Sequence, residues 1–218
     1  MKKSILPLLA VILVAFSSCT RDRVTGNGSI TTQDRPVSNF TKITAKGSTD
    51  AFIVKGNTFK VQVKGSDNLV PYFETRVVNG TLNLGFENDV NVRHDDIQVF
   101  VTMPVLTGLK TQGSGNITAS GNFTDNADFE TVIAGSGNIT IEQGSARNFS
   151  TDISGSGDVH AFGFNAENAN IKVSGSGNSR ITASNQLDVR IAGSGNVYYK
   201  GSPQVSVKIS GSGSVIKQ

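Results

Sequence analysis

Apolar and polar residues alternate along most of this chain, and in its second half a glycine-rich tetrapeptide interrupts the alternation at regular intervals. The residues two, four and six positions before each first glycine are mostly apolar or β-branched, as in Leu187, Val189 and Ile191. The residues four and six positions after it are mostly apolar too, as in Ile139 and Ile141. A period of two predicts a β-strand on each side of a turn, with one face buried and the other in water.

The tetrapeptide, Gly-Ser-Gly-Asn with small variations, returns every 18 to 22 residues between Gly113 and Ser214. A repeat of this length is typical of solenoids, in which one repeat cannot bury its apolar edge alone and must stack on its neighbours. The pattern therefore predicts an all-β fold, a parallel β-helix with rungs of 18–22 residues. A second, looser turn is expected eight or nine residues after each first glycine, at Gly121, Gly144, Gly163, Ser184 and Gly201.

The tetrapeptides are expected to form the sharp corner of each rung. Glycine adopts positive φ without steric cost, so both glycines are expected to do so, and Asn and Asp tolerate left-handed geometry. The predicted corner residues are Gly113, Gly115, Asn116, Gly135, Gly137, Asn138, Gly155, Gly157, Asp158, Gly175, Gly177, Asn178, Gly193, Gly195, Asn196, Gly211 and Gly213. Stacking predicts one ladder of the Asn and Asp side chains and a second ladder of the serines.

The outward positions of the stacked rungs offer one candidate binding surface. Val132, Asp152, Lys172, Arg190 and Lys208 are expected in one column, and Glu130, Ser150, Asn170, Asp188 and Ser206 in the next. Lys172, Arg190 and Lys208 form a candidate basic stripe for an anionic glycan. The alternative is a solvated face whose charges balance across rungs.

The first residues resemble a bacterial lipoprotein signal. Lys2 and Lys3 precede an apolar stretch from Ile5 to Phe16, and two serines then precede Cys19. The stretch is shorter than the roughly 20 residues that a membrane-spanning helix needs. We expect residues 1–18 to be a signal peptide, Cys19 to carry a lipid anchor that attaches the protein to the membrane, and residues 19–25 to be a tether. The predicted location is the cell envelope, as an outer-membrane lipoprotein, on either face of that membrane.

Charge and cysteine content argue against a nucleic-acid-binding protein and against a disulfide-stabilised fold. The formal net charge is +3, and loss of Lys2 and Lys3 leaves 18 cations against 17 acids, near +1. No nucleic-acid partner is expected from such a balance. Cys19 is the single cysteine, so no intrachain disulfide can form.

Residues 24–110 show the same alternation of apolar and polar residues, but the glycine-rich turn motifs are less regular. Gly47-Ser-Thr-Asp50 and Gly26-Asn-Gly-Ser29 look like degenerate copies of the corner, and no low-complexity linker separates this half from the repeats. We expect residues 26–218 to form a single elongated domain.

The chain resembles the auto-transporter adhesin head family, or GIN domain, found in envelope lipoproteins of Bacteroidetes-type bacteria. The resemblance covers roughly residues 26 to 218 and rests on the segments Phe40–Gly56, Gly65–Leu69 and Asn79–Leu84 together with the repeated Gly-Ser-Gly-Asn. It implies a right-handed β-helix and little chemistry.

Many β-helix proteins cut or bind polysaccharides, so the solvent-facing side of the stack is the place where a catalytic or metal-binding pattern would be expected. His94 and His160 lie far apart and lack a paired nucleophile, so no triad is indicated, and both are interpreted as solvated loop residues. Calcium-binding β-rolls carry a carboxylate in every turn, whereas here Asp158 is the acidic member of the repeat. No cofactor and no metal are expected.

Three functions remain open on these patterns. The first is a non-enzymatic binding or adhesion module for a glycan or an envelope protein. The second is a structural protein that assembles, as a homo-oligomer, through an open β-helix end, because the chain ends at Gln218 directly after a turn. The third, more remote, is a polysaccharide-cleaving enzyme, which would require an outward cluster of carboxylates.

Overall fold

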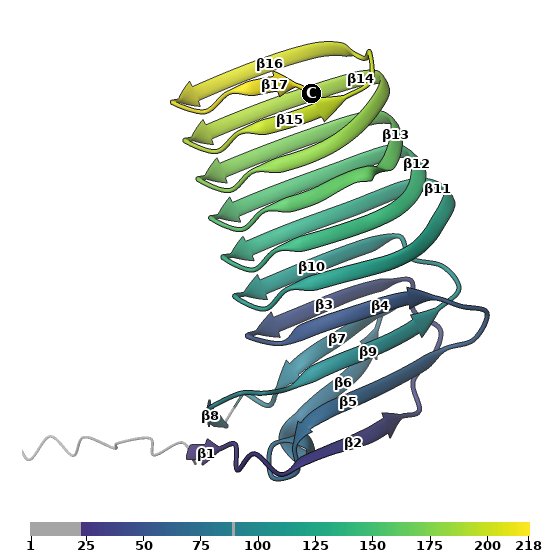
Figure 1. Cartoon of the computed structure of the whole chain (residues 1–218), viewed down its shortest axis with the longest axis vertical. Coiled ribbons are helices and arrows are strands. Elements are labelled where there is room, and N and C mark those ends of the chain that lie inside the picture. Colours follow the sequence, from purple (N-terminus) through teal and green to yellow (C-terminus); the bar gives the residue numbers. More distant parts are fainter. Residues whose placement is uncertain (1–22, 89) are drawn as a thin grey trace, which may run out of the picture.

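The computed structural model describes residues 23–88 and 90–218, and most of them lie in β-strands (Figure 1). The predicted signal peptide and Cys19 lie outside the described residues. A single 3-10 helix, η1, spans Val70–Tyr72. The strands are β1 Arg23–Thr25, β2 Ile30–Arg35, β3 Lys42–Gly47, β4 Asp50–Lys55, β5 Lys60–Ser66, β6 Phe73–Val78, β7 Thr81–Phe86, β8 Asn91–Arg93, β9 Gln98–Met103, β10 Gly108–Gly113, β11 Ile117–Gly135, β12 Ile139–Gly155, β13 Val159–Gly175, β14 Ser179–Gly193, β15 Val197–Lys200, β16 Gln204–Gly211 and β17 Val215–Lys217.

The second half is a stack of parallel coils, which confirms the predicted β-solenoid of rungs about 20 residues long. Strands β10 to β14 pair in parallel with the coil above and below, and β15, β16 and β17 continue the stack (Figure 1). The register aligns each first glycine with the next, as in Gly135↔Gly155 and Gly155↔Gly175. The repeat therefore sets the register of the stack.

Each coil contributes one strand segment to each of two sheets, and the two segments meet at the sharp corner. The strands before the corner form the pre-corner sheet, and those after it form the post-corner sheet, which includes β4, β9, β15 and β17 (Figure 1). On the other side β11, β12, β13 and β14 continue through the expected looser turns as long bent strands, with register shifts in two of their pairings. The looser turns in these four strands are gradual bends, and pairing between the coils continues on both sides of them.

The core fills the space between the two sheets. Phe129, Phe149 and Phe164 pack together with ring centroids 4.8 to 6.0 Å apart. Thr131 and Thr151 are also buried, and their hydroxyls share a hydrogen bond of 2.8 Å. The side chains that point inward are thus those at the apolar positions predicted by the alternation. The two buried threonines satisfy their hydrogen-bonding groups with each other.

The first half departs from the regular stack. β3 and β4 form one further coil under β10 and β11, but β5 pairs antiparallel with β2 and β9, and β6 pairs antiparallel with β7. The Gly47–Asp50 segment is a true corner. The expectation for Gly26–Ser29 is wrong, because among the described strands β1 pairs only with β8, and Asn27 binds Asn68 and Asp67 instead of a neighbouring coil.

The last coil leaves apolar side chains uncovered. Val205, Val207 and Ile209 of β16 are 40–46% exposed, whereas their neighbours one coil below, such as Val189, are buried. In the described part of the chain β16 pairs only with β14, so one edge of it is free. The same part of the chain contains no helix that is long and apolar enough to cross a membrane.

Candidate functional site

The corner glycines occupy two different environments. The first glycine of each corner has positive φ, for example 137° at Gly155, and a Cβ there would lie 2.1 Å from the carbonyl oxygen of Gly135. The second glycines do not have positive φ, so that expectation is wrong for them. Gly157 is glycine because a Cβ would lie 2.0 Å from the oxygen of Gly137. Both positions exclude side chains, but only the first needs a special backbone conformation.

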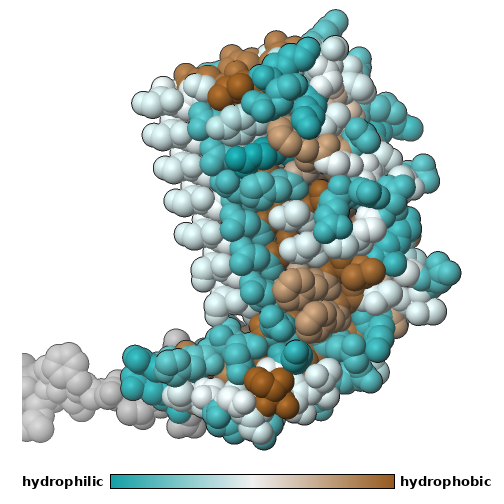
Figure 2. Space-filling view, in the orientation of Figure 1, coloured by the Kyte–Doolittle hydropathy of each residue, from teal (hydrophilic) through white to brown (hydrophobic). Residues whose placement is uncertain are grey.

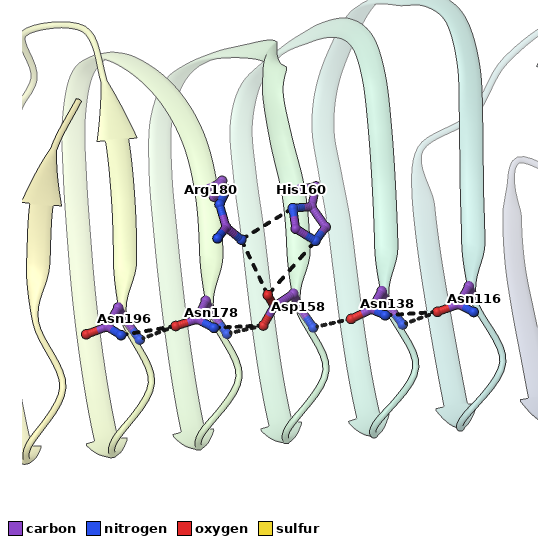
Figure 3. Close-up of polar contacts among 7 residues, drawn as sticks. All are labelled: Asn116, Asn138, Asp158, His160, Asn178, Arg180 and Asn196. Atoms are coloured by element: carbon purple, nitrogen blue, oxygen red, sulfur yellow. Dashed lines mark hydrogen bonds and ion pairs between the residues drawn. The ribbon is translucent and has the colours of Figure 1, made fainter.

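The Asn and Asp side chains form the predicted ladder along the coils (Figure 3). The Oδ1 of each accepts a hydrogen bond from the backbone N–H of the next, as Asn138 Oδ1 does from Asp158 at 2.8 Å. The ladder begins one coil earlier than the repeat, because Asp50 Oδ1 accepts from Asn116, and Ser214 N–H donates to its last member, Asn196. None of these Asn and Asp residues has positive φ, so they do not use the left-handed geometry that they tolerate.

The corner serines form an exposed row. Figure 2 shows the corners as a pale column along one edge of the molecule. The backbone holds this row, since Ser136 N–H donates to Gly113 O at 2.9 Å and Ser156 N–H donates to Gly135 O at 2.9 Å. No hydrogen bond joins one of these hydroxyls to the next within the described residues, so the second ladder is one of backbone bonds. The hydroxyls face solvent.

The predicted basic stripe lies in one column of the pre-corner sheet. Register aligns Asp152, Lys172, Arg190 and Lys208 on successive coils. Lys172 Nζ lies 3.3 Å from Asp152 Oδ2, and both side chains are exposed. One member of the stripe is therefore already paired with a carboxylate.

A groove of about 840 Å³ runs beside that column, where the coils bend. Its walls are two rows of polar side chains that repeat from coil to coil, and Lys42 lies at its lower end. The two rows are Asp128, Asn148, Asn168 and Gln186, and Glu130, Ser150, Asn170 and Asp188. The sequence pattern placed the second row in one outward column, but the concavity arises from the bend and could not be predicted from the alternation.

Amides in the groove are linked into a chain. Asn148 Nδ2 donates to Asp128 Oδ1 at 2.9 Å, and Asn168 Nδ2 donates to Asn148 Oδ1 at 3.2 Å. An amide carries two N–H donors and two acceptor lone pairs, so each of these side chains keeps one donor for a ligand. Lys42 Nζ lies 3.3 Å from Glu130 Oε2, which leaves Asp128 and Asp188 as carboxylates without a cation in the groove wall.

The post-corner sheet carries a second polar cluster (Figure 3). Arg180 Nη1 lies 3.4 Å from Asp158 Oδ2 and 3.3 Å from His160 Nδ1. Burial lowers the pKa of His160 below its ordinary value, the positive charge of Arg180 lowers it further, and Asp158 opposes both effects. The neutral imidazole can accept a hydrogen bond from Arg180, whereas the imidazolium cannot.

The two histidines have different environments. His94 lies in an exposed loop, as expected, next to Asp95 and Asp96, whose carboxylates bind Ser48 and Ser66. His160 was expected in a loop too, and this is wrong, because it lies on β13 within the cluster. The alternation could have shown this, since His160 occupies an outward strand position. Over residues 23–88 and 90–218, no three His, Cys, Asp or Glu side chains come together as a metal site would require.

Comparison with known proteins decides the family. The family model described as "Putative auto-transporter adhesin, head GIN domain" matches residues 39–203, about three quarters of the chain. The chain belongs to this GIN domain family. The predicted resemblance is thereby confirmed, and the protein is an adhesin-like module of unknown specific function.

Solved structures with a similar fold come from Bacteroides and Parabacteroides species. A putative adhesin from Bacteroides fragilis matches with a TM-score of 0.70 and 22% identity, over 89% of this chain and 100% of that one. A putative lipid binding protein from Parabacteroides distasonis matches with a TM-score of 0.55 and 27% identity, over 90% and 100%. No curated protein matches the chain. Membership of this adhesin family indicates that the protein is located in the cell envelope or on the cell surface.

Proposed function

We propose that this GIN domain protein is a non-enzymatic, envelope-anchored module that binds a linear glycan in the groove at the bend of its coils. The observation that carries the proposal is the pair of polar rows that line a groove of about 840 Å³. Concave sites with a few convergent polar groups are the usual form of ligand sites. The adhesin description of the family supports binding over catalysis.

The spacing of the rows favours an extended chain. Adjacent coils lie about 4.8 Å apart, so Asn148, Asn168 and Gln186 present similar groups at that interval along the groove. This interval is comparable with the advance of one sugar along an extended glycan. Each coil can then contact one sugar unit with the same chemistry.

The groups suit the hydroxyls of a neutral sugar. Amides both donate and accept hydrogen bonds, and Asp128 and Asp188 accept from hydroxyl donors. Three carboxylates against the single ammonium of Lys42 make the groove unfavourable for a polyanion. The basic stripe of Lys172, Arg190 and Lys208 beside it stays a candidate for acidic substituents on a glycan that extends past the groove.

Anchoring would strengthen such binding. The proposed lipid on Cys19 would hold many copies in one membrane, and the proposed outer-membrane location would expose them to envelope or extracellular glycans. Multivalent display raises avidity without any new contact, provided that neighbouring copies reach the same polymer. In a detergent phase-partitioning experiment, the parent protein should stay in the detergent phase. The Cys19→Ser variant should lose this retention, because it cannot carry the proposed lipid.

Binding should be measured by calorimetry on the full chain in detergent, with neutral linear oligosaccharides of increasing length. The double variant Asn148→Ala with Asn168→Ala should lose at least tenfold in affinity, and affinity should rise with chain length up to the length of the groove. Gln112→Ala removes an exposed amide outside the groove and is the matched control. Equal loss in the control, or silence of folded protein across a broad glycan array, would overturn the proposal. Release of reducing ends would show an enzyme instead.

A second candidate function is assembly through the last coil. Val205, Val207 and Ile209 are exposed at 40–46%, and the free edge of β16 can pair with another strand. Lys217 opposes this, because it occupies the inward position above Tyr199 and places a charge at the end of the core. Light scattering decides between the outcomes: a dimer that Val207→Lys converts to monomer supports assembly, and a monomer at all concentrations excludes it.

A further inference from the structure

The post-corner sheet carries a compact patch of cations and aromatic rings that lies apart from the groove. Three successive coils contribute two outward side chains each, in neighbouring columns of the sheet. The coils are aligned by the pairs His160↔Arg180, Arg180↔Tyr198 and Thr182↔Lys200. The members of this cation–aromatic patch are His160, Phe162, Arg180, Thr182, Tyr198 and Lys200.

The two cations in the patch are held against aromatic rings. Arg180 Cζ lies 5.0 Å from the centroid of the Tyr198 ring, and Lys200 Nζ lies 4.6 Å from that of Phe162. Contacts of this length are attractive and restrict where the charges lie. The two charged groups therefore stay over the sheet surface. Ligand binding then costs less side-chain entropy, because both side chains are already partly ordered.

The patch has charge to spare. Arg180 contacts both Asp158 and His160 through Nη1, and the other three of its five N–H groups stay available. Lys200 takes part in no ion pair among the described residues. His160 is neutral in this arrangement, because its Nδ1 must accept the hydrogen bond from Arg180. The patch thus has two cations, Arg180 and Lys200, and one carboxylate, Asp158, which pairs with Arg180, so its net charge is about +1 beside two aromatic rings.

We infer that this patch binds a carboxylate-bearing sugar, such as a uronic acid unit of an acidic glycan. The free N–H groups of Arg180 and the ammonium of Lys200 would receive the carboxylate, since charge-assisted bonds to guanidinium are strong and directional. The C–H groups of the sugar ring would pack on Phe162 and Tyr198. Thr182 Oγ1 donates to Phe162 O at 2.8 Å, so its hydroxyl keeps an acceptor for a sugar hydroxyl.

Figure 2 looks onto this sheet and shows hydrophobic side chains among polar ones along its length. Toward the base the rings of Phe52 and Phe100 are stacked at 5.3 Å in the same outward column as His160 and Arg180. Thr118 and Thr140 separate the ring pair from His160 in that column. A longer acidic glycan could therefore continue along the column from the patch to this ring pair.

The test compares oligogalacturonate with its methyl ester, titrated into the full chain at low salt. We expect the acid to bind and the ester to bind at least tenfold more weakly, with affinity for the acid falling as salt rises. Arg180→Gln and Lys200→Gln should each weaken binding of the acid at least tenfold. Arg76→Gln and Lys64→Gln, which remove exposed cations on β6 and β5, should change it less than twofold.

Several results would overturn the inference. Equal affinity for acid and ester would remove the role of the carboxylate. Equal affinity for glucose 6-phosphate or for vesicles of anionic lipid would show a general anion site. A loss in Arg190→Gln without a loss in Arg180→Gln would place the site on the basic stripe. If Arg180→Gln fails to fold, Lys200→Gln still tests the inference. The groove variant with Asn148→Ala and Asn168→Ala should leave binding of oligogalacturonate unchanged.

Discussion

Asp158 accepts two hydrogen bonds from Asn178 on the next coil, one from its backbone N–H at 2.8 Å and one from Nδ2 at 2.9 Å. Its other oxygen faces Arg180 at 3.4 Å. This one residue therefore joins the ladder that orders the corners to the charged cluster on the post-corner sheet. The remaining members of the repeat are Asn or, at Ser214, Ser, and they lack the charge.

Substitutions at Asp158 should separate the two roles. Asp158→Ala leaves both donors of Asn178 without a partner in a half-buried place, so we expect a loss of about 1–3 kcal/mol in the free energy of unfolding. Asp158→Asn keeps an acceptor and should cost clearly less. Urea unfolding of the two variants measures the difference, and equal losses would contradict the assigned role of the ladder. Asp158→Asn should also tighten binding of an acidic sugar, because Arg180 then loses its internal counter-ion.

His160 should make stability depend on pH. Its folded pKa is lowered by burial first and by Arg180 second, while the unfolded chain takes up the proton near pH 6.5. Below that value the unfolded state binds more protons than the folded state, so stability should fall as the pH drops from about 6.5 through the lowered pKa. Above pH 7 the residue should contribute no pH dependence.

The measurement is urea unfolding between pH 5 and 8, with His160→Gln as the comparison. Gln cannot titrate, so the slope of stability against pH in this window should become flatter. Titration of the His160 ring by NMR should give a pKa below its ordinary value of 6.5. A His160 ring that titrates at or above 6.5 would contradict the assigned environment.

The two glycines of a corner should both resist substitution, for different reasons. Gly155→Ala meets a positive φ and the oxygen of Gly135, and Gly157→Ala meets the oxygen of Gly137 in an ordinary backbone conformation. We expect each to lower the free energy of unfolding by roughly 2 kcal/mol or more. Ser156→Ala, between them and exposed, should stay within about 0.5 kcal/mol of the parent. Thermal unfolding of the three variants checks this.

The buried threonine pair should show strong coupling. Thr131 and Thr151 share a hydrogen bond of 2.8 Å inside the core, and Thr131 Oγ1 also donates to Ser150 O at 3.4 Å. Removal of the Thr131 hydroxyl therefore leaves the Thr151 hydroxyl without its partner. Thr131→Val alone should destabilise the fold by about 1 kcal/mol, whereas the double variant with Thr151→Val should be nearly neutral. Additive losses in a double-mutant cycle would contradict a shared bond.

The sequence was sufficient for the regular features of the fold. A tetrapeptide that returns every 18 to 22 residues and flanking positions of period two specify stacked coils, because the register is set wherever glycine must lie over glycine. The outward columns that contain Lys172 and Asp188 followed from the same register. Short segments such as Asn79–Leu84, together with the repeat, were enough to indicate the family.

Tertiary structure decided what the repeat does not specify. Whether Gly157 needs positive φ or only space depends on the carbonyl of another coil, and local sequence does not contain that distance. The antiparallel pairing of β5 with β2 and β9 depends on contacts between segments tens of residues apart. The groove exists because the strands bend, and the patch exists because the register places Arg180 beside Tyr198 and His160. Periodicity fixes which residues point outward, but curvature and side-chain packing determine which of them meet.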